Sequence, residues 1–576
     1  MNRFALTLPD VLVIAGYFLV VIWIGLECRG RIKAPGDYFA GGHQVPWWLA
    51  GISHYMSTFS ALSFVMYAQL GYTWGWVSVT LFWVTVPACI LGGLIFAGRW
   101  RQARVITPVE FLERRFNNLI RQLFAWAGVP MKLFEDGLKL FATSIFLAAS
   151  MGVSVKWAII VSGAVTIFYT LLGGLWALVV SDYVQFLMKM LAMLLLLPLA
   201  LWHAGGFRHA FASAPPAFFH PLNGPYNWVY LLGFAVLIAM SYNGSWALAQ
   251  KYYSVRDTRD ASKAAYLSAA LNFIGAPIMI LPSMIGRGFL PDLIAQHRTA
   301  DAYVLLVLKV LPAGMVGVTI AALLSATMAT VSSDFNAIAS VLTQDVYHRL
   351  LRPKADARQL VRMGRIITTI VGSISVSCSL WIAFSGQQSL LELMVTVAGV
   401  FLAPSYLPLL AALIWRRLTW KGALLGYCLG IASGFTMLFL RFSLAHHHPD
   451  GWMRGFDGIS ILLNTGLTIF GMWAGSILLH STESEQGRIE TFFQKFDQPV
   501  ARTAASQGLG PALAKTTIAV GGLLAAAAVL TPALAAKVVD FAVALTLILI
   551  GVAMWVRASR AGRLGERGHG HAAPGS

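Results

Sequence analysis

The chain has 576 residues, of which 57% are hydrophobic and only 11% are charged. Soluble domains carry about 25% charged residues, so this chain has too little charge to coat the surface of a water-soluble fold. The composition excludes a soluble enzyme, a disordered scaffold and a free nucleic-acid-binding protein. It predicts an all-α polytopic membrane protein, in which short basic loops between apolar segments account for the net charge of +18 without nucleic acid.

Apolar segments recur along the chain. A membrane-spanning helix needs roughly 20 apolar residues, and on this criterion we expect about fifteen spans. The first, 9–28, has no small-residue cleavage site and is interpreted as a retained helix. The stretch 303–344 is too long for one span, which predicts protruding ends or a short outer helix before it. The expected spans are 9–28, 46–71, 74–97, 120–152, 155–174, 181–203, 228–249, 263–287, 303–344, 363–385, 389–415, 419–441, 457–479, 513–534 and 539–557.

Basic residues alternate between the loops. Every second loop is rich in Lys and Arg, whereas 204–227 and 442–456 contain only Arg208 and Arg454 respectively. Because basic loops remain in the cytoplasm, the pattern predicts an N-terminus outside and a C-terminus inside.

The region after residue 480 differs from the rest. Residues 481–511 mix acidic and basic side chains and are predicted to form an amphipathic cytoplasmic loop. Residues 512–558 contain two C-terminal spans, and 559–576 form a basic, His-rich tail predicted to be disordered. The triplet His446–His448 could bind a metal ion, but without a second ligand cluster a solvated outer loop is favoured.

Two spans contain unusual polar interruptions. Seven of the eleven residues in 53–63 carry hydrogen-bonding side chains, and 241–246 is similarly polar in the seventh span. The functional interpretation is a broken helix that faces a cavity, and the alternative is helix packing through small residues. Two such segments five helices apart indicate inverted repeats, about 46–203 and 228–441, with a binding site between their first helices.

The ninth span carries a stripe of small and hydroxyl residues. Hydroxyl and carbonyl oxygens suit a hard cation, although a packing stripe is the alternative. Asp182, at the start of the sixth span, is either a helix N-cap or, if it lies near the ninth span, part of a cation site. The residues that share one face of the ninth span are Ala326, Ala329, Thr330 and Ser333.

Ordered motifs resemble the sodium:solute symporter family. The resemblance runs from about residue 8 to about residue 480 and implies a LeuT-like core of 5+5 inverted repeats. It further implies one extra N-terminal helix and about four extra C-terminal helices, with 1–480 as the symporter core. The motifs are Asp37-Tyr38-Phe39-Ala40-Gly41-Gly42 and the segments 46–51, 107–116, 169–185, 250–252, 332–347 and 422–423.

The resemblance also implies sodium sites. The family usually has a serine at position 329, where this chain has Ala329, and that departure removes one of about five oxygen ligands. Asp334 is not a usual family residue and is a candidate to compensate. The ligands implied for a first site are the carbonyls of Met56, Phe59 and Ala326 and the hydroxyl of Thr330, and those for a second site are Asp182, Ser332 and Ser333. One or two sodium ions are therefore expected, without an organic cofactor.

The solute is constrained by fewer residues. By position, the resemblance implies that Thr58, Ser60 and Ser63 contact the solute, and Tyr242 is added from the seventh span. Where sialic-acid members have an arginine, this chain has Glu135, which would repel an anionic solute. The alternative is that Glu135 merely pairs with Lys139 at i+4. A neutral sugar or polyol, a zwitterion or a cation is thus expected rather than sialic acid.

The resulting function is sodium-coupled secondary active transport of a small polar solute by alternating access, in a bacterial inner membrane and without enzymatic activity. The alternatives are a solute sensor of the same fold, disfavoured because no kinase-sized domain follows residue 557, and a symporter of an organic acid or vitamin. No motif supports a channel or an intramembrane enzyme. The expected partners are the solute and the lipid bilayer, and the sequence leaves the oligomeric state open, a monomer included.

Overall fold

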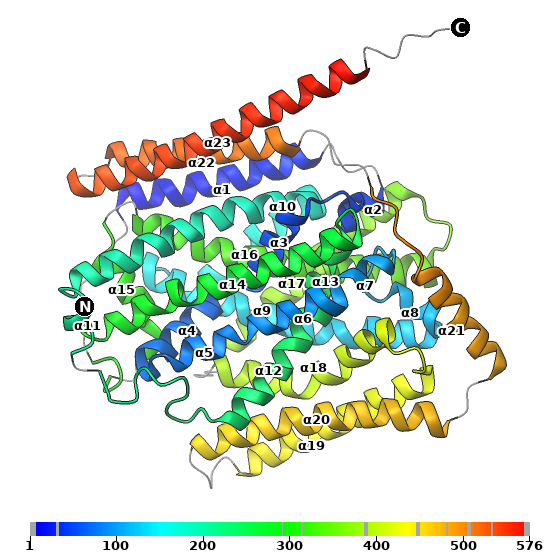
Figure 1. The fold of residues 1–576 in the computed structure, drawn as a ribbon. Helices are drawn as coiled ribbons and strands as arrows, with labels where there is room; N and C mark the ends of the chain where they lie inside the picture. Colours follow the sequence, from blue (N-terminus) through cyan, green and yellow to red (C-terminus); the bar gives the residue numbers. More distant parts are fainter. Residues whose placement is uncertain are drawn as a thin grey trace.

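All regular secondary structure in the described residues is helical (Figure 1). Within them, extended pairing is confined to an isolated parallel bridge between Val45 and Val255. The all-α prediction is confirmed. The computed structural model describes residues 7–29, 34–212, 214–290, 292–296, 298–312, 315–384, 390–444, 450–479, 482–503, 509–530 and 534–569.

Helices of very different length follow one another along the chain. The first half contains α1 Leu8–Arg29, α2 Pro35–Ala40, η1 Gly41–His43, α3 Trp47–Met56, α4 Ala61–Trp74, α5 Val77–Trp83, α6 Thr85–Leu91, η2 Gly92–Phe96, α7 Ala97–Gln102, α8 Glu110–Arg115, α9 Asn118–Met151, α10 Val155–His203, α11 Phe207–Ala210, α12 Trp228–Gly244, α13 Trp246–Tyr253 and α14 Thr258–Gly286. The second half contains η3 Thr299–Asp301, α15 Ala302–Val310, α16 Met315–Val341, η4 Leu342–Leu351, α17 Ala357–Phe384, α18 Leu390–Ile414, α19 Trp420–Leu444, α20 Asp450–Leu478, α21 Glu483–Phe496, α22 Leu509–Leu530 and α23 Leu534–His569.

Nine helices in the described part of the chain are long and apolar enough to cross a bilayer, and a tenth counts if the bent pair α12–α13 is one span. The other expected spans are interrupted, charged or short: the pair α3–α4, the charge-bearing α9, and the apolar stretches 155–171, 510–526 and 541–556. The total of about fifteen therefore stays a prediction. The overlong stretch 303–344 contains a short helix, α15, followed by the long helix α16, which is one of the two arrangements expected for it.

Both polar interruptions are breaks in helices. Residues 57–60 separate α3 from α4, and Ser60 is extended at φ −131° and ψ 170°. The Ala61 amide at the start of α4 donates a 2.8 Å hydrogen bond to Thr327 Oγ1, which satisfies one of the donors freed by the break. In the seventh span, Ser245 (φ −60°, ψ 133°) separates α12 from α13, and the two axes differ by 51°.

Gly174 separates the two spans that lie within α10. Its backbone is at φ 52° and ψ −151°, a conformation that L-residues rarely adopt. A Cβ atom at this position would lie 2.7 Å from the carbonyl oxygen of Tyr38. The glycine therefore allows both the turn of the chain and the close approach of α2.

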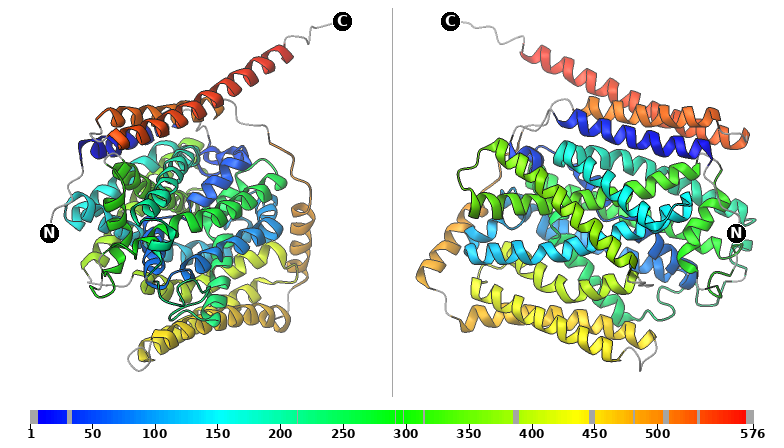
Figure 2. Two further views of the ribbon diagram at one scale, coloured as in Figure 1. Left: turned by 60° about the vertical axis from the view of Figure 1, so that its left-hand side comes forward. Right: turned by 180° about the vertical axis from the view of Figure 1, so that it is seen from behind.

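Helix α16 occupies the centre of the molecule, and all of its residues are buried. Around it the long helices run in roughly similar directions, and α1 packs with α22 and α23 on one side while α19 and α20 form the opposite side (Figures 1 and 2). Functional side chains at the centre must therefore come from α16 and the helices next to it.

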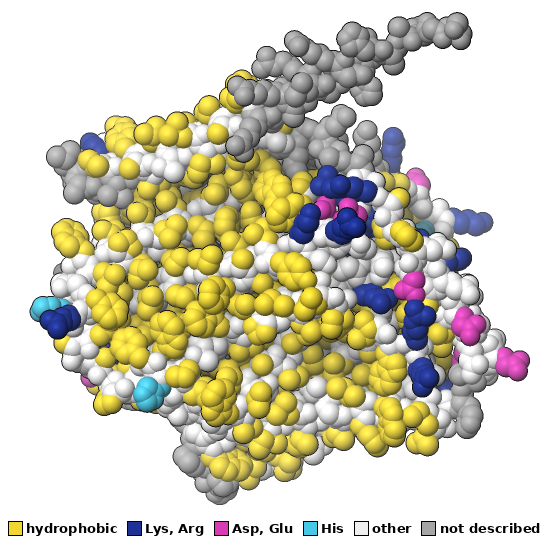
Figure 3. Space-filling view, in the orientation of Figure 1, with side chains coloured by type: hydrophobic (Ala, Val, Ile, Leu, Met, Phe, Trp, Pro, Cys, Tyr) yellow, Lys and Arg dark blue, Asp and Glu magenta, His cyan; other side chains and the backbone are white. Residues whose placement is uncertain are grey.

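The surface divides into a broad hydrophobic belt and a basic end (Figure 3). Helix α21 lies at that end, with Phe492, Phe493 and Phe496 buried, and Asp497 after it pairs with Arg99 and Arg416. Within the segment 481–511, for which an amphipathic loop was expected, residues 483–496 thus form a helix docked on the body. Helix α23 continues to His569, past the expected end at 558, whereas 570–576 and the triplet at 446–448 lie outside the described residues.

Candidate functional site

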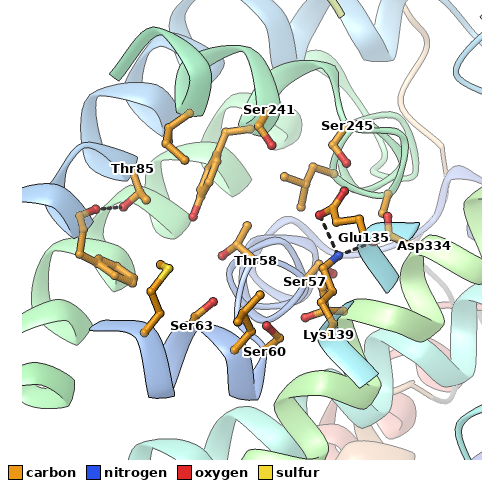
Figure 4. A pocket seen from close by; sticks show the side chains of 18 of the residues that line it. Ser57, Thr58, Ser60, Ser63, Thr85, Glu135, Lys139, Ser241, Ser245 and Asp334 are labelled. Carbon is orange, nitrogen blue, oxygen red and sulfur yellow. Dashed lines mark hydrogen bonds and ion pairs between the residues drawn. The ribbon is translucent and has the colours of Figure 1, made fainter. Parts of the chain in front are cut away.

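A cavity of about 120 Å³ lies beside the break between α3 and α4. It is enclosed by side chains from this break and from α9, α12, α13 and α16 (Figure 4). All five residues expected to contact a solute line it, although their contact with a solute stays a prediction. They are Thr58, Ser60, Ser63, Glu135 and Tyr242, and Ser57, Ser241, Ser245, Thr330 and Asp334 are among the other polar residues of the lining.

One wall of the cavity carries four residues of a cluster of five charged side chains; Asp136 is the member that does not line the cavity. Lys139 Nζ lies 2.9 Å from both Glu135 Oε1 and Asp334 Oδ2, and 3.3 Å from Asp136 Oδ1. Lys132 Nζ lies 3.0 Å from Glu135 Oε2 and 3.3 Å from Asp334 Oδ1. Glu135 therefore faces the cavity and also pairs with Lys139, so both interpretations of this residue describe part of the arrangement. The five groups carry a formal charge of −1, whereas the four that line the cavity, two ammonium groups and two carboxylates, balance one another.

Asp334 connects α16 to α9 through this cluster. Its carboxylate points toward Lys139 and Glu135 at one side of the cavity (Figure 4). The sequence pattern indicated Asp334 and Glu135 separately and did not connect them, and Lys132 was not among the predicted residues. Charged residues at i, i+3, i+4 and i+7 along an apolar span are rarely accidental. The spacing of 132, 135, 136 and 139 was therefore a signal available in the sequence.

Two of the carbonyl oxygens expected at the first sodium site lie next to the Thr330 hydroxyl. This hydroxyl lies 2.5 Å from the Phe59 carbonyl oxygen and 3.0 Å from the Ala326 carbonyl oxygen. The Met56 carbonyl, one residue before the break, accepts a 3.1 Å hydrogen bond from the Phe59 amide. Ala329 contributes no side-chain oxygen. This set of hydroxyl and carbonyl oxygens fits a hard cation, which prefers oxygen ligands.

The residues expected at the second sodium site meet only in part. Asp182 lies inside α10 rather than at its start, so the N-cap alternative is wrong. Its carboxylate accepts a hydrogen bond from Ser53 and lies 4.0 Å from Lys251 Nζ, which also donates to Ser333 Oγ at 3.2 Å. Ser332 does not join them, because its hydroxyl lies 3.4 Å from the Ala329 carbonyl oxygen of its own helix.

Lys251 was not among the expected site residues. Its side chain is fully buried, and it comes from α13, the shorter part of the bent pair α12–α13. The sequence predicted Lys251 as a basic residue of a cytoplasmic loop and as part of the motif 250–252 that supports the family resemblance, whereas the structure places it buried within α13. Nothing in the local pattern indicated that it reaches Asp182 on α10.

A second buried lysine lies against the broken helix. Lys189 Nζ is 3.3 Å from the centre of the Phe59 ring and 3.9 Å from that of Tyr55. It is fully buried, and its ammonium has no hydrogen-bond partner among the described residues. Among the described residues, the electron-rich faces of these rings are what compensates its charge, through cation–π attraction.

Comparison with known proteins identifies the family. A family model described as the sodium:solute symporter family matches residues 38–430, well over half of the chain. The chain belongs to this family.

The relatives of this symporter-family chain are named for different solutes. A sodium/mannose cotransporter of Bos taurus is 25% identical over 77% of this chain and 82% of its own length. A sodium/sialic acid symporter of Aliivibrio fischeri is 24% identical over 74% of this chain and 86% of its own length. Family membership makes this chain a multi-pass membrane protein of a family of sodium-coupled solute transporters.

A solved structure shares the fold of this family member. The substrate-bound, outward-open state of a Na⁺-coupled sialic acid symporter matches with a TM-score of 0.69 and 20% identity. The match covers 82% of this chain and 98% of the other. The similarity supports the LeuT-like fold that the motifs implied, and at this identity it concerns the fold alone.

Proposed function

We propose that this protein is a sodium-coupled symporter that imports a small polar organic solute by alternating access. The observation that carries the proposal is the break between α3 and α4. It presents the Phe59 carbonyl to the oxygen cluster around Thr330, and it presents Thr58 and Ser60 to the cavity. The four residues 57–60 contribute both to the oxygen cluster around Thr330 and to the cavity. A cation that orders this segment therefore also orders the solute site, so that cation binding and solute binding are thermodynamically linked.

The first sodium position consists of the carbonyls of Met56, Phe59 and Ala326 and the Thr330 hydroxyl, with no side-chain ligand from Ala329. Asp182 and Ser333 form a second cation position, with Ser332 next to it. The core is an arrangement of 5+5 inverted repeats, 46–203 and 228–441, whose first helices are the two broken pairs. The N-terminus lies outside and the C-terminus inside, in a bacterial inner membrane.

The solute is a neutral sugar or polyol, a zwitterion or a cation. The charged groups that line the cavity are two ammonium groups, of Lys132 and Lys139, and two carboxylates, of Glu135 and Asp334, which pair with one another. No ammonium group in this lining is left over to pair with an anionic solute, so desolvating one here would be unfavourable, which argues against sialic acid although relatives are named for it. Hydroxyl groups on the opposite wall offer hydrogen bonds to a polyol.

Uptake into proteoliposomes tests the proposal. Purified protein is first screened by thermal shift against sugars, polyols, amino acids and carboxylates in sodium and in potassium. The stabilising solute is then followed isotopically with an inward gradient of either ion. We expect uptake above equilibrium with sodium and none with potassium. Equal uptake in both would contradict sodium coupling, and binding without any transport would favour the sensor.

A further inference from the structure

Lys251 occupies the space between the residues of the second cation position. Its ammonium lies 4.0 Å from Asp182 Oδ2 and donates a 3.2 Å hydrogen bond to Ser333 Oγ. The side chains of all three residues are fully buried. Ser57 Oγ, from the break between α3 and α4, lies 3.1 Å from Ser333 Oγ and extends the same network.

The oxygens that remain do not suit a sodium ion. Asp182 Oδ2 already accepts from Ser53, and Ser333 accepts from Lys251. The hydroxyl of Ser332 is directed at a carbonyl of its own helix. Among the described residues, Asp182 Oδ1 is the one oxygen of the expected ligands without a hydrogen-bond partner. A hard cation takes several oxygen ligands, so the residues present do not fit a second ion while Lys251 stays in place.

The charges lead to the same conclusion. Asp182 and Lys251 together are neutral, and a sodium ion placed between them would leave one uncompensated positive charge in a fully buried site. Burying an unpaired charge is strongly unfavourable. One carboxylate cannot neutralise two cations at this depth.

We propose that the ammonium of Lys251 takes the place of the second sodium ion, so that the transporter binds one sodium ion with each solute. The inference rests on the proposed symport function and narrows its ion stoichiometry. A cation that is covalently part of α13 cannot cross the membrane with the solute. It instead holds α13 to α10 and α16, the helices of Asp182 and Ser333, without dissipating an ion gradient.

Equilibrium binding of ²²Na⁺ to purified protein, at a saturating concentration of the solute found by thermal shift, tests this without relying on transport. For the wild-type protein we expect one ion per chain and a Hill coefficient near one. Lys251→Met removes the ammonium but keeps an unbranched apolar stem, and it should bind two ions. The double variant with Asp182→Asn and Lys251→Met should again bind one sodium ion per chain. Lys251→Arg keeps the positive charge and should also bind one ion.

Two outcomes would overturn the inference. They are two ions in the wild-type protein with loss of one in Asp182→Asn, or one ion in a folded Lys251→Met variant. If Lys251→Met does not fold, the single variant Asp182→Asn decides. One bound sodium ion in both the wild-type protein and Asp182→Asn supports the proposed role of the Lys251 ammonium. A decrease from two bound ions to one excludes it. No bound sodium in the wild-type protein would instead contradict the proposed symport function itself.

Discussion

Thr330 is the residue on which the first cation position depends most. Its hydroxyl is within hydrogen-bond distance of the carbonyls of Phe59 and Ala326, and Ala329 beside it offers only a methyl group. The Thr330 hydroxyl is therefore the side-chain oxygen that α16 contributes to the expected ligands of the first cation position. The other expected ligands are backbone carbonyls, which side-chain substitution leaves in place.

Thr330→Val should raise the sodium concentration needed for half-maximal uptake at least tenfold, because the isosteric change removes this oxygen; tenfold corresponds to about 1.4 kcal/mol of binding free energy. A sodium titration of uptake in proteoliposomes measures it. Thr319→Val is the control, since the Thr319 hydroxyl bonds to the Met315 carbonyl one turn earlier on the same helix. Identical sodium curves for Thr330→Val and the wild-type protein would exclude this cation position.

Lys189 is a residue whose burial costs stability. The desolvation penalty for a buried ion is several kcal/mol, whereas cation–π attraction returns only about 2 kcal/mol when desolvated. Lys189→Met should therefore stabilise the protein by about 1–3 kcal/mol, seen as a higher midpoint of thermal unfolding in detergent. Lys189→Ala, which also opens a cavity, should be less stable than Lys189→Met. A lower midpoint for Lys189→Met would show that the ammonium has a partner that stabilises it.

At the scale of elements, two glycines that end helical segments differ in their surroundings. Gly174 combines a positive φ with the nearby Tyr38 carbonyl, whereas Gly152 has φ 68° and open space around it. Gly174→Ala should destabilise the protein by at least about 2 kcal/mol, because strain and a steric clash add. Gly152→Ala should cost about 1 kcal/mol. Thermal unfolding compares them, and equal effects would mean that α2 and α10 are not tightly packed at Gly174.

The charged cluster joins α9 to α16. Asp334→Asn removes the negative charge that pairs with Lys139 at 2.9 Å and with Lys132 at 3.3 Å, and breaking such buried pairs costs about 3–5 kcal/mol. The exposed pair of Arg298 and Asp301 is the reference, for which Asp301→Asn should cost less than about 1 kcal/mol. Unfolding of the single variants and of Asp334→Asn with Lys139→Met gives the coupling energy. A coupling near zero would mean that Asp334 does not hold the two helices together.

At the scale of the whole molecule, the basic end marks the expected cytoplasmic side. Lys and Arg gather at the end where α7, α8 and α21 lie (Figure 3). Exposed Arg417 lies between α18 and α19 in a loop expected inside, and exposed His220 lies between α11 and α12 in a loop expected outside.

Cysteines placed at these two positions test the orientation. Arg417→Cys should react with a membrane-impermeant maleimide only in inverted vesicles, and His220→Cys only in intact cells. Labelling is compared with that of the parent protein, because Cys428 is exposed in the structure and supplies a background signal. The opposite pattern would reverse the proposed topology.

The sequence by itself determined the helical class, the places of both helix breaks and the family. Each of these depends on local pattern: polar residues stand out in an apolar span because the bilayer offers them no hydrogen bonds. The oxygens expected at Thr330 were implied by the family resemblance rather than by local pattern, and their role as ion ligands stays a prediction.

Only the tertiary structure decided how buried charges are paired. Lys132, Asp334 and Glu135 form one cluster because α9 and α16 pack side by side, and Lys251 reaches Asp182 because the bend after α12 directs α13 toward α10. Helical periodicity specifies the face on which a residue lies but not the neighbour of that face. A buried lysine is compensated by whichever carboxylate or ring the packing brings to it, so its partner is a property of the assembled helices.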